Sequence, residues 1–205
     1  MATNVALAHD KFQRQLAFGQ IAETDIALWL MHRGGVVLPI YDIEYDTGKG
    51  PRMFLVDRSL VAPDLLVFSR GSLKWIEAKH KSVFTWHWTS ARKGKSEVEC
   101  WQTGIDQHHY RQYLEVEKVS GVPIWLLFFH ITSTPDSRDL NRSEWPCPEK
   151  CPVGLFGAPL KELSECVHHT DWRWGRHGMV YWMSSSLRLI ATLEEVQKSA
   201  NARRK

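Results

Sequence analysis

The feature that most constrains the fold is a pair of apolar segments joined by a short polar connection. Residues 64–68 read Asp-Leu-Leu-Val-Phe, residues 73–79 read Leu-Lys-Trp-Ile-Glu-Ala-Lys, and Ser69-Arg-Gly-Ser72 lies between them. Branched and aromatic side chains favour strands, and Ser and Gly favour a tight turn. The pattern therefore predicts a β-hairpin in which one strand begins with Asp64 and the other contains Glu77 and Lys79.

Helical and strand patterns alternate along the rest of the chain. The sequence predicts a helix from Asp10 to about His32, a β-rich segment over 36–45, a returning strand over 53–56, a helix over 103–119, an apolar strand over 124–131, a last strand over 179–183 and a closing helix over 187–197. Residues 82–100 read as a loop, and residues 132–178 as an irregular insertion rich in Cys and Pro. This order predicts one α/β domain, a mixed β-sheet flanked by helices, with its core at about 10–131 and 179–198.

The predicted hairpin carries residues that suit hydrolytic chemistry. Glu77 and Lys79 share a face of their strand, and Asp64 lies across the hairpin, close enough to meet Glu77. Two neighbouring carboxylates repel each other unless a cation lies between them. Mg²⁺ takes oxygen ligands, and a lysine beside it can orient or deprotonate a water. The arrangement favours metal-assisted hydrolysis of a phosphodiester.

A surface strand with Glu77 and Lys79 facing solvent is the alternative. Trp75 shares their face by the same alternation, so that this face is partly covered. Glu23 falls within the apolar stripe of the first helix, where its charge needs a partner. Both observations favour a site over a solvated strand.

On these residues the chain resembles the PD-(D/E)XK nuclease superfamily. Pro63-Asp64 is followed, after twelve residues, by Glu77-Ala78-Lys79, and the resemblance covers residues 15–131. It implies a restriction-endonuclease-like fold and hydrolysis of DNA that depends on Mg²⁺ or Mn²⁺. It also implies that Asp64 and Glu77 bind the metal, that Glu23 is an additional ligand, and that Lys79 assists the attacking water.

Two further positions are candidates for the same site. Some members of the superfamily carry Gln-x-x-x-Tyr in the next helix, and Gln107-His-His-Tyr110 is one residue shorter. Gln107 is therefore a candidate contact for a metal-bound water or a phosphate, with an ordinary polar helix face as the alternative. Lys81 shares the face of Glu77 and Lys79 if the strand continues, and it would hold a phosphate; the alternative is a surface residue that closes the strand.

Charge and aromatic residues give weaker indications of a nucleic-acid partner. The net charge is only +3, but residues 61–100 contain seven basic and four acidic side chains. In the nuclease interpretation, Arg92, Lys93 and Lys95 flank a DNA groove; a solvated loop is the alternative. Six tryptophans outside the predicted core could stack on bases or fill gaps under loops: Trp86, Trp88, Trp101, Trp145, Trp172 and Trp174.

The four cysteines suggest a second metal site. Cys147, Cys151, Cys166 and His168 could supply three thiolates and one imidazole to a structural Zn²⁺, although their spacing matches no tight zinc-finger pattern. Free thiols, some of them buried as small apolar side chains, are the alternative.

The composition predicts a cytoplasmic protein. No run of about 18 apolar residues is present, and residues 1–20 have charged residues among the apolar ones, so we expect neither a membrane span nor a signal peptide. The main hypothesis is a metal-dependent deoxyribonuclease that binds DNA, with homodimerisation left open. A non-catalytic nucleic-acid-binding module and a metal-stabilised interaction protein are the alternatives.

Overall fold

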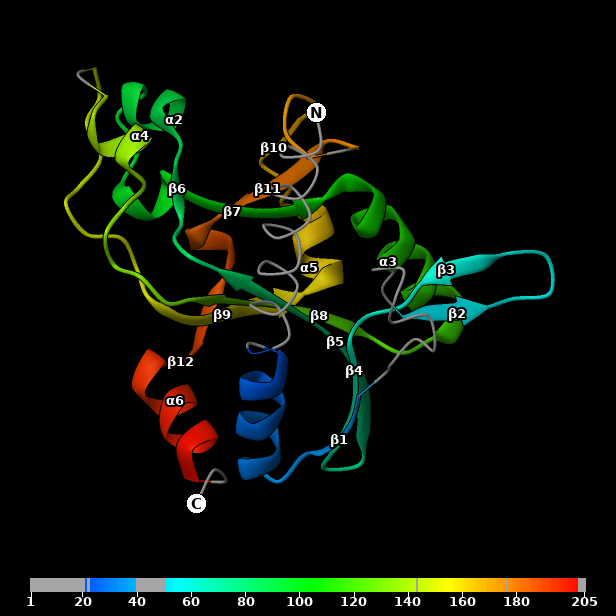
Figure 1. Cartoon of the computed structure of the whole chain (residues 1–205). Coiled ribbons are helices and arrows are strands. Elements are labelled where there is room, and N and C mark those ends of the chain that lie inside the picture. Colours follow the sequence, from blue (N-terminus) through cyan, green and yellow to red (C-terminus); the bar gives the residue numbers. More distant parts are fainter. Residues whose placement is uncertain (1–20, 22, 40–50, 143, 176, 203–205) are drawn as a thin grey trace, which may run out of the picture.

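A six-stranded mixed sheet forms the centre of the computed structural model, which describes residues 21, 23–39, 51–142, 144–175 and 177–202 (Figure 1). The strand order is β1-β4-β5-β8-β9-β12. The strands are β1 (Val36–Pro39), β4 (Leu65–Ser69), β5 (Ser72–Lys81), β8 (Ile124–His130), β9 (Gly154–Pro159) and β12 (Arg188–Ala191). The β5–β8 pair is parallel, and the other neighbours in this sheet are antiparallel. The predicted α/β class, a mixed sheet flanked by helices, is confirmed.

Two smaller sheets extend the molecule. A four-stranded sheet has the order β10-β11-β7-β6 and a two-stranded sheet pairs β2 with β3. Their strands are β2 (Arg52–Phe54), β3 (Ser59–Val61), β6 (Thr85–Trp86), β7 (Trp101–Asp106), β10 (His169–Asp171) and β11 (Met179–Met183). In Figure 1 the β2–β3 ribbon projects from the body beside α3 (Gln107–Ser120).

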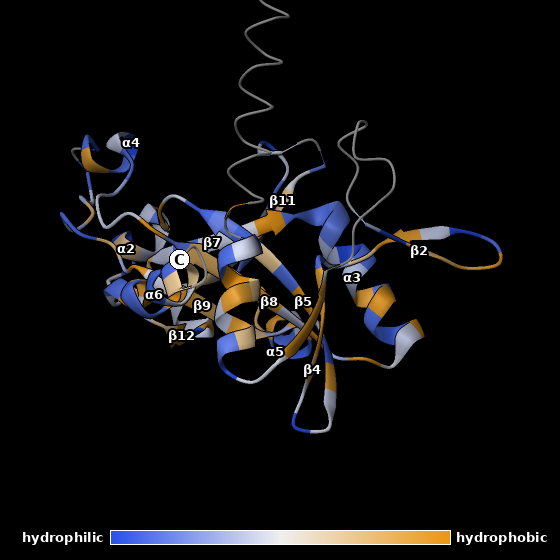
Figure 2. Cartoon of the chain, turned by 60° about the horizontal axis from the view of Figure 1, so that its bottom comes forward, coloured by the Kyte–Doolittle hydropathy of each residue, from blue (hydrophilic) through white to orange (hydrophobic). Residues whose placement is uncertain are grey.

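Helices cover both faces of the main sheet. A helix over residues 23–32, blue in Figure 1, lies next to α6 (Leu193–Ala202), while α3 and α5 (Leu160–Glu165) lie on the other side of the sheet. Ile26 and Trp29 pack with Ile76 in one apolar cluster, and Trp75 and Tyr113 belong to another. The alternation along β5 thus supplies a core on each face, and the neighbouring strand β4 is coloured mostly hydrophobic in Figure 2. Shorter helical segments are α2 (Trp88–Arg92), η2 (Glu97–Glu99), α4 (Ser137–Leu140) and η3 (Ser184–Ser186).

The predicted hairpin is present as β4 and β5. Its turn places Arg70 and Gly71 at φ values of 47° and 75°, the left-handed region that a two-residue hairpin turn requires. Ser69 pairs with Ser72 and Leu65 pairs with Ile76. Continuing this antiparallel register by one residue places Asp64 opposite Glu77.

The stretch 82–100, predicted as a loop, contains the short elements β6, α2 and η2. Three further segments differ from the sequence prediction. Residues 103–106 belong to strand β7 rather than to a helix, because they pair with β11. Helix α3 begins only after them, where Asp106 caps it by accepting a hydrogen bond of 2.8 Å from the His108 N–H. Residues 188–191 form strand β12, paired with β9. The segment 132–178 contains β9 and α5, so part of the expected irregular insertion lies in the main sheet and its helical layer. The Asp10 cap and the residues 40–50 of the predicted strand and turn lie outside the described residues.

None of the helices in the described part of the chain combines the length and the hydrophobicity that crossing a bilayer needs.

Replacing Gly157 with alanine tests how closely β9 packs against β8 in the main sheet. A Cβ at this position would lie 2.7 Å from the Leu126 carbonyl oxygen of β8 and would also collide with the Leu127 side chain. We expect Gly157→Ala to lower the free energy of unfolding by about 1–3 kcal/mol, the usual cost of overpacking. Urea denaturation followed by circular dichroism measures this change. Leu189→Ala, at a 55% exposed position of β12, is the control and should stay within about 0.5 kcal/mol of the unmodified chain; equal stability of the two variants would contradict the packing.

Candidate active site

The register of the β4–β5 hairpin brings Asp64 and Glu77 together. The Ala78 N–H donates a hydrogen bond of 2.9 Å to the Asp64 carboxylate, which anchors this side chain beside β5. Burial and then the negative charge of Glu77 raise the pKa of Asp64 well above its usual range. The two carboxylates are therefore close enough to destabilise each other's charge.

Glu77 lies at the centre of this group. Its side chain is 0% exposed, so its polar partners come from the protein and not from bulk solvent. Lys79, two residues along the same face of β5, forms an ion pair with it. The Lys79 side chain remains 29% exposed, so its ammonium group lies between the buried carboxylate and the surface.

Glu23 completes an acidic group drawn from three elements. Ile26 and Trp29 pack in one apolar cluster with Ile76 and Ala78, and so place the start of their helix near Glu77 on β5. Burial raises the pKa of Glu23, and Glu77 adds to this shift while Lys79 opposes it. Burial alone would lower the pKa of Lys79, but Glu77, Asp64 and Glu23 together raise it. The structure thus brings together the four residues predicted from the sequence.

The chemistry of this group fits a divalent cation. Three carboxylates face one ammonium group, so the acidic groups outnumber the basic one. Hard divalent cations such as Mg²⁺ and Mn²⁺ take carboxylate oxygens as ligands. Asp64 and Glu77, with Glu23 beside them, are therefore the residues suited to hold such an ion.

Helix α3 adds two residues that the sequence prediction missed. Tyr113 is 1% exposed, and burial followed by the charge of Glu77 raises the pKa of its phenol well above the usual range. His109 lies one helical turn earlier, and burial and then the charge of Lys79 lower its pKa. Two residues four apart share a helix face. His109 and Tyr113 have the same four-residue spacing as the Gln and Tyr of the Gln-x-x-x-Tyr pattern. A search for a polar residue four positions before a tyrosine would therefore have identified this helix face, with His109 at the position of the glutamine.

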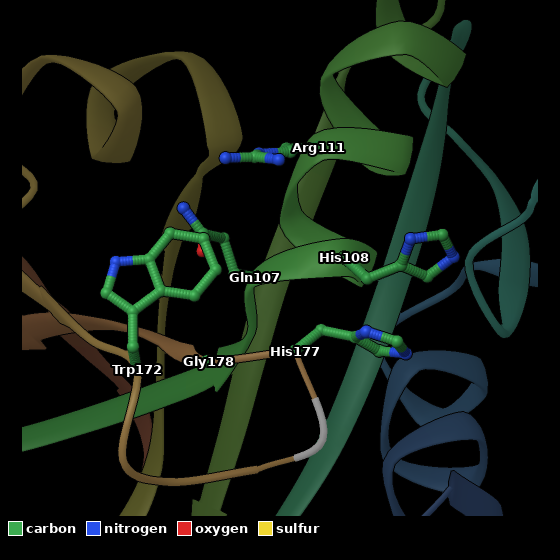
Figure 3. A pocket seen from close by; sticks show the side chains of 6 residues that line it. All are labelled: Gln107, His108, Arg111, Trp172, His177 and Gly178. Carbon is green, nitrogen blue, oxygen red and sulfur yellow. The ribbon is translucent and has the colours of Figure 1, made fainter.

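Gln107 lies in a neighbouring hollow at the start of α3. This hollow of about 300 Å³ is lined by Gln107, His108, Arg111, Trp172, His177 and Gly178 (Figure 3). The Gln107 side-chain oxygen is buried and accepts no hydrogen bond within the described residues. Trp172 is 65% exposed and stands at the opposite wall from α3 in Figure 3. Tyr110, the other residue of the shorter motif, packs edge-on against Trp182 with ring centroids 5.6 Å apart.

The basic candidates occupy two regions. Lys81 continues the face of Glu77 and Lys79 at the end of β5, and burial together with the charge of Lys79 lowers its pKa to about 8. Arg92 ends α2, and Lys93 and Lys95 are exposed just after it, where Lys95 forms an ion pair of 3.3 Å with Glu99.

The structure does not bring the four predicted zinc ligands together. Cys151 is buried in the core and its thiol donates to the Thr132 carbonyl at 3.2 Å. Cys166 is exposed after α5, and its thiol donates to the Glu162 carbonyl at 3.2 Å. His168 instead belongs to a cluster of three histidines. Of the six tryptophans singled out, Trp86 and Trp101 are buried, whereas the other four are exposed.

Comparisons with known proteins give matches among solved structures alone. No protein-family model matches the sequence, and a search of curated proteins finds no significant match. Among solved structures, the chain is similar to Hjc, a Holliday junction resolvase from the archaeal hyperthermophile Archaeoglobus fulgidus, with a TM-score of 0.44 and 9% identity. The match covers 88% of this chain and 99% of that one.

Asp64→Asn tests the electrostatic strain of the acidic group. Asparagine keeps an oxygen for the Ala78 N–H but removes one of the mutually repelling charges. A carboxyl whose pKa is raised in the folded state lowers the stability of that state when it ionises. We therefore expect the free energy of unfolding of Asp64→Asn, at pH 7 in EDTA, to exceed that of the unmodified chain by about 1 kcal/mol. Thermal and urea unfolding measure the difference.

The matched control is Asp57→Asn, at an aspartate on the surface, which should leave stability within about 0.5 kcal/mol. For the unmodified chain, the raised pKa predicts that the contribution of Asp64 to stability increases as the pH falls from 7 toward 5. A loss of stability in Asp64→Asn in EDTA would contradict the repulsion.

Proposed function

We propose that this protein is a metal-dependent nuclease that hydrolyses phosphodiester bonds of DNA. The observation that carries the proposal is the convergence of Glu23, Asp64 and Glu77 around Lys79 at the β4–β5 hairpin. Buried ionisable groups with strongly shifted pKa values, gathered from several elements, are typical of active sites. The buried carboxylates argue against the solvated-strand alternative.

Asp64 and Glu77 would hold Mg²⁺ or Mn²⁺, with Glu23 as the additional ligand. The ion would supply positive charge to the phosphoryl oxygens as negative charge develops on them. The position of Asp64 is set by its hydrogen bond from Ala78, and that of Glu77 by its place in the middle of β5. Glu77 thus stands on a strand and Asp64 directly before one, which holds them more firmly than long loops would.

Lys79 and Lys81 would act on the scissile phosphate and its attacking water. Lys79 carries three N–H donors beside Glu77, so it can hold a water for in-line attack while its carboxylate partner fixes the ammonium group. Lys81 follows Lys79 by two residues on the same strand face, and its ammonium group would bind a phosphate oxygen. Tyr113 supports this arrangement from α3, where its phenol faces Glu77.

The surface around the site offers contacts for DNA. Trp172 and Arg111 line the hollow at the start of α3, and an exposed indole with a nearby guanidinium suits a base and its phosphate. On α2, Trp88 is 38% exposed and lies under the Arg142 guanidinium at 5.5 Å. Arg92, with Lys93 and Lys95, would contact phosphates further along the duplex.

Cleavage assays with site variants test the catalytic assignment. Linear duplex, single-stranded, supercoiled and four-way-junction DNA, together with a single-stranded RNA, would be incubated with Mg²⁺, Mn²⁺ or EDTA. We expect cleavage only with metal, and a loss of at least about 100-fold in rate for Lys79→Ala, Asp64→Asn and Glu77→Gln, because each removes a group that acts on the reacting phosphate. The preferred substrate identifies the branch of nuclease.

Lys74→Ala is the matched control, since Lys74 is on the same strand but lies over Trp125 at 5.6 Å. It should cleave at the rate of the unmodified chain. DNA binding without cleavage of any substrate would support the non-catalytic binding module instead. Absence of both binding and cleavage would favour an interaction protein.

The salt dependence of DNA binding tests the basic segment after α2. Replacing Arg92, Lys93 and Lys95 together with alanine should weaken binding and reduce the slope of log K against log salt by up to about 0.9 for each phosphate that these side chains neutralise. Fluorescence anisotropy with labelled duplex measures both quantities. A control triple variant at Lys118, Lys161 and Lys198, which lie on α3, α5 and α6, should keep the original slope. Unchanged affinity and slope in the first variant would exclude this segment from the interface.

A further inference from the structure

Three histidine side chains converge on the four-stranded sheet, away from the carboxylates. His87 lies between β6 and α2, whereas His168 and His169 lie at the start of β10. One ring nitrogen from each lies within 4.8 Å of the other two. We propose that these three imidazoles form a binding site for a transition-metal ion of the Zn²⁺ class, distinct from the carboxylate site.

The cluster joins two opposite edges of one sheet. In the order β10-β11-β7-β6, the strand before His87 and the strand that begins at His169 are the two outer strands. The ring centroids of His168 and His169 nevertheless lie 4.7 Å and 4.9 Å from that of His87. A metal ion bound here would link segments that no strand pairing connects directly.

The backbone holds both sides of the cluster in place. The His87 N–H donates to the Cys100 carbonyl at 2.8 Å, and the His168 N–H donates to the Tyr181 carbonyl at 2.9 Å. Both anchors belong to segments at or beside the inner strands β7 and β11. The convergence of the three rings is therefore built into the sheet, which lowers the cost of ordering the ligands when an ion binds.

The orientations of the rings also suit metal binding. The His87 Nδ1 atom lies 2.9 Å from the Ser90 hydroxyl, which leaves Nε2 free to ligate, and such a partner on the second nitrogen is typical of histidine ligands. The His169 ring stacks on Tyr181 at 4.8 Å with an interplanar angle of 12°. The Nδ1 atoms of His168 and His169 face each other at 2.7 Å, so their two lone pairs need a proton or a cation between them.

Burial favours the neutral form of the three histidines, which is the form that binds metals. Burial lowers the pKa of His87 to about 4, and His168, His169 and Lys93 add to this effect. Burial also lowers the pKa values of the other two rings, while the charge of Asp171 opposes this shift at His169. Asp171 is itself paired with Arg173 at 2.7 Å. No proton therefore has to be displaced from an imidazolium at pH 7.

The donor set identifies the class of metal. Imidazole nitrogens suit Zn²⁺ and its neighbours in the first transition series, whereas Mg²⁺ prefers oxygen ligands. Tetrahedral Zn–N bonds of about 2.0–2.1 Å put the ligand nitrogens roughly 3.3 Å apart, a spacing that modest ring rotations would reach. Three protein ligands leave the fourth position for water or a solute, and the exposed His168 provides the route for the ion.

Metal titrations of the full chain in excess Mg²⁺ test the proposal, because Mg²⁺ competes for carboxylate oxygens but little for imidazole. We expect one equivalent of Co²⁺ to bind with the intense visible absorption of a four-coordinate ion, and Zn²⁺ to displace it. His87→Gln and His169→Gln should each weaken binding at least tenfold. His32→Gln, at an exposed histidine of the first helix, should bind as the unmodified chain does.

X-ray absorption at the zinc edge provides a test that needs no variant. The zinc-loaded chain should show nitrogen neighbours at about 2.0–2.1 Å, and a sulfur shell at about 2.3 Å would instead point to the cysteines. The absence of one-equivalent binding, affinity unchanged in both histidine variants, or a sulfur shell would each overturn the proposal. These readouts do not involve DNA cleavage, so they stand or fall independently of the proposed nuclease.

Discussion

The opposition of Asp64 and Glu77 across the β4–β5 hairpin is the constraint on which the whole site depends. Antiparallel pairing of Leu65 with Ile76 fixes this opposition, and burial then makes two neighbouring negative charges costly. Lys79 compensates part of that cost through its ion pair with Glu77. Apolar residues of similar volume would stabilise this position at least as well, so the charges are better explained by the proposed metal site than by stability.

The layers on either side of the main sheet both serve this hairpin. One layer supplies Glu23 from a helix held by Ile26 and Trp29, and the other supplies Tyr113 from α3. Packing and chemistry are thus coupled, because the apolar contacts that stabilise each helix also determine how far its polar residue lies from β5. The hollow beside α3 and the basic segment after α2 offer further surfaces to larger ligands.

Local sequence patterns predicted much of the hairpin and its acidic group, but they did not predict which strands pair over long sequence separations. The turn at Arg70 and Gly71 and the apolar run of β8 can be read from neighbouring residues. Strands β9 and β12 could not, since each is short and is stabilised by partners distant in sequence. The approach of His168 to His87 could not be predicted either, because it joins segments at the two outer strands of one sheet, which no spacing motif reveals.

The proposal that Asp64 and Glu77 hold a divalent ion is tested most directly by soaking crystals of the full chain in Mn²⁺ and locating the ion by anomalous scattering. We expect an anomalous-difference peak within about 2.0–2.6 Å of carboxylate oxygens of both Asp64 and Glu77, with Glu23 at or next to the ion. A structure in which those carboxylates remain without an ion, while Lys79 keeps its ion pair and manganese binds elsewhere, would contradict it.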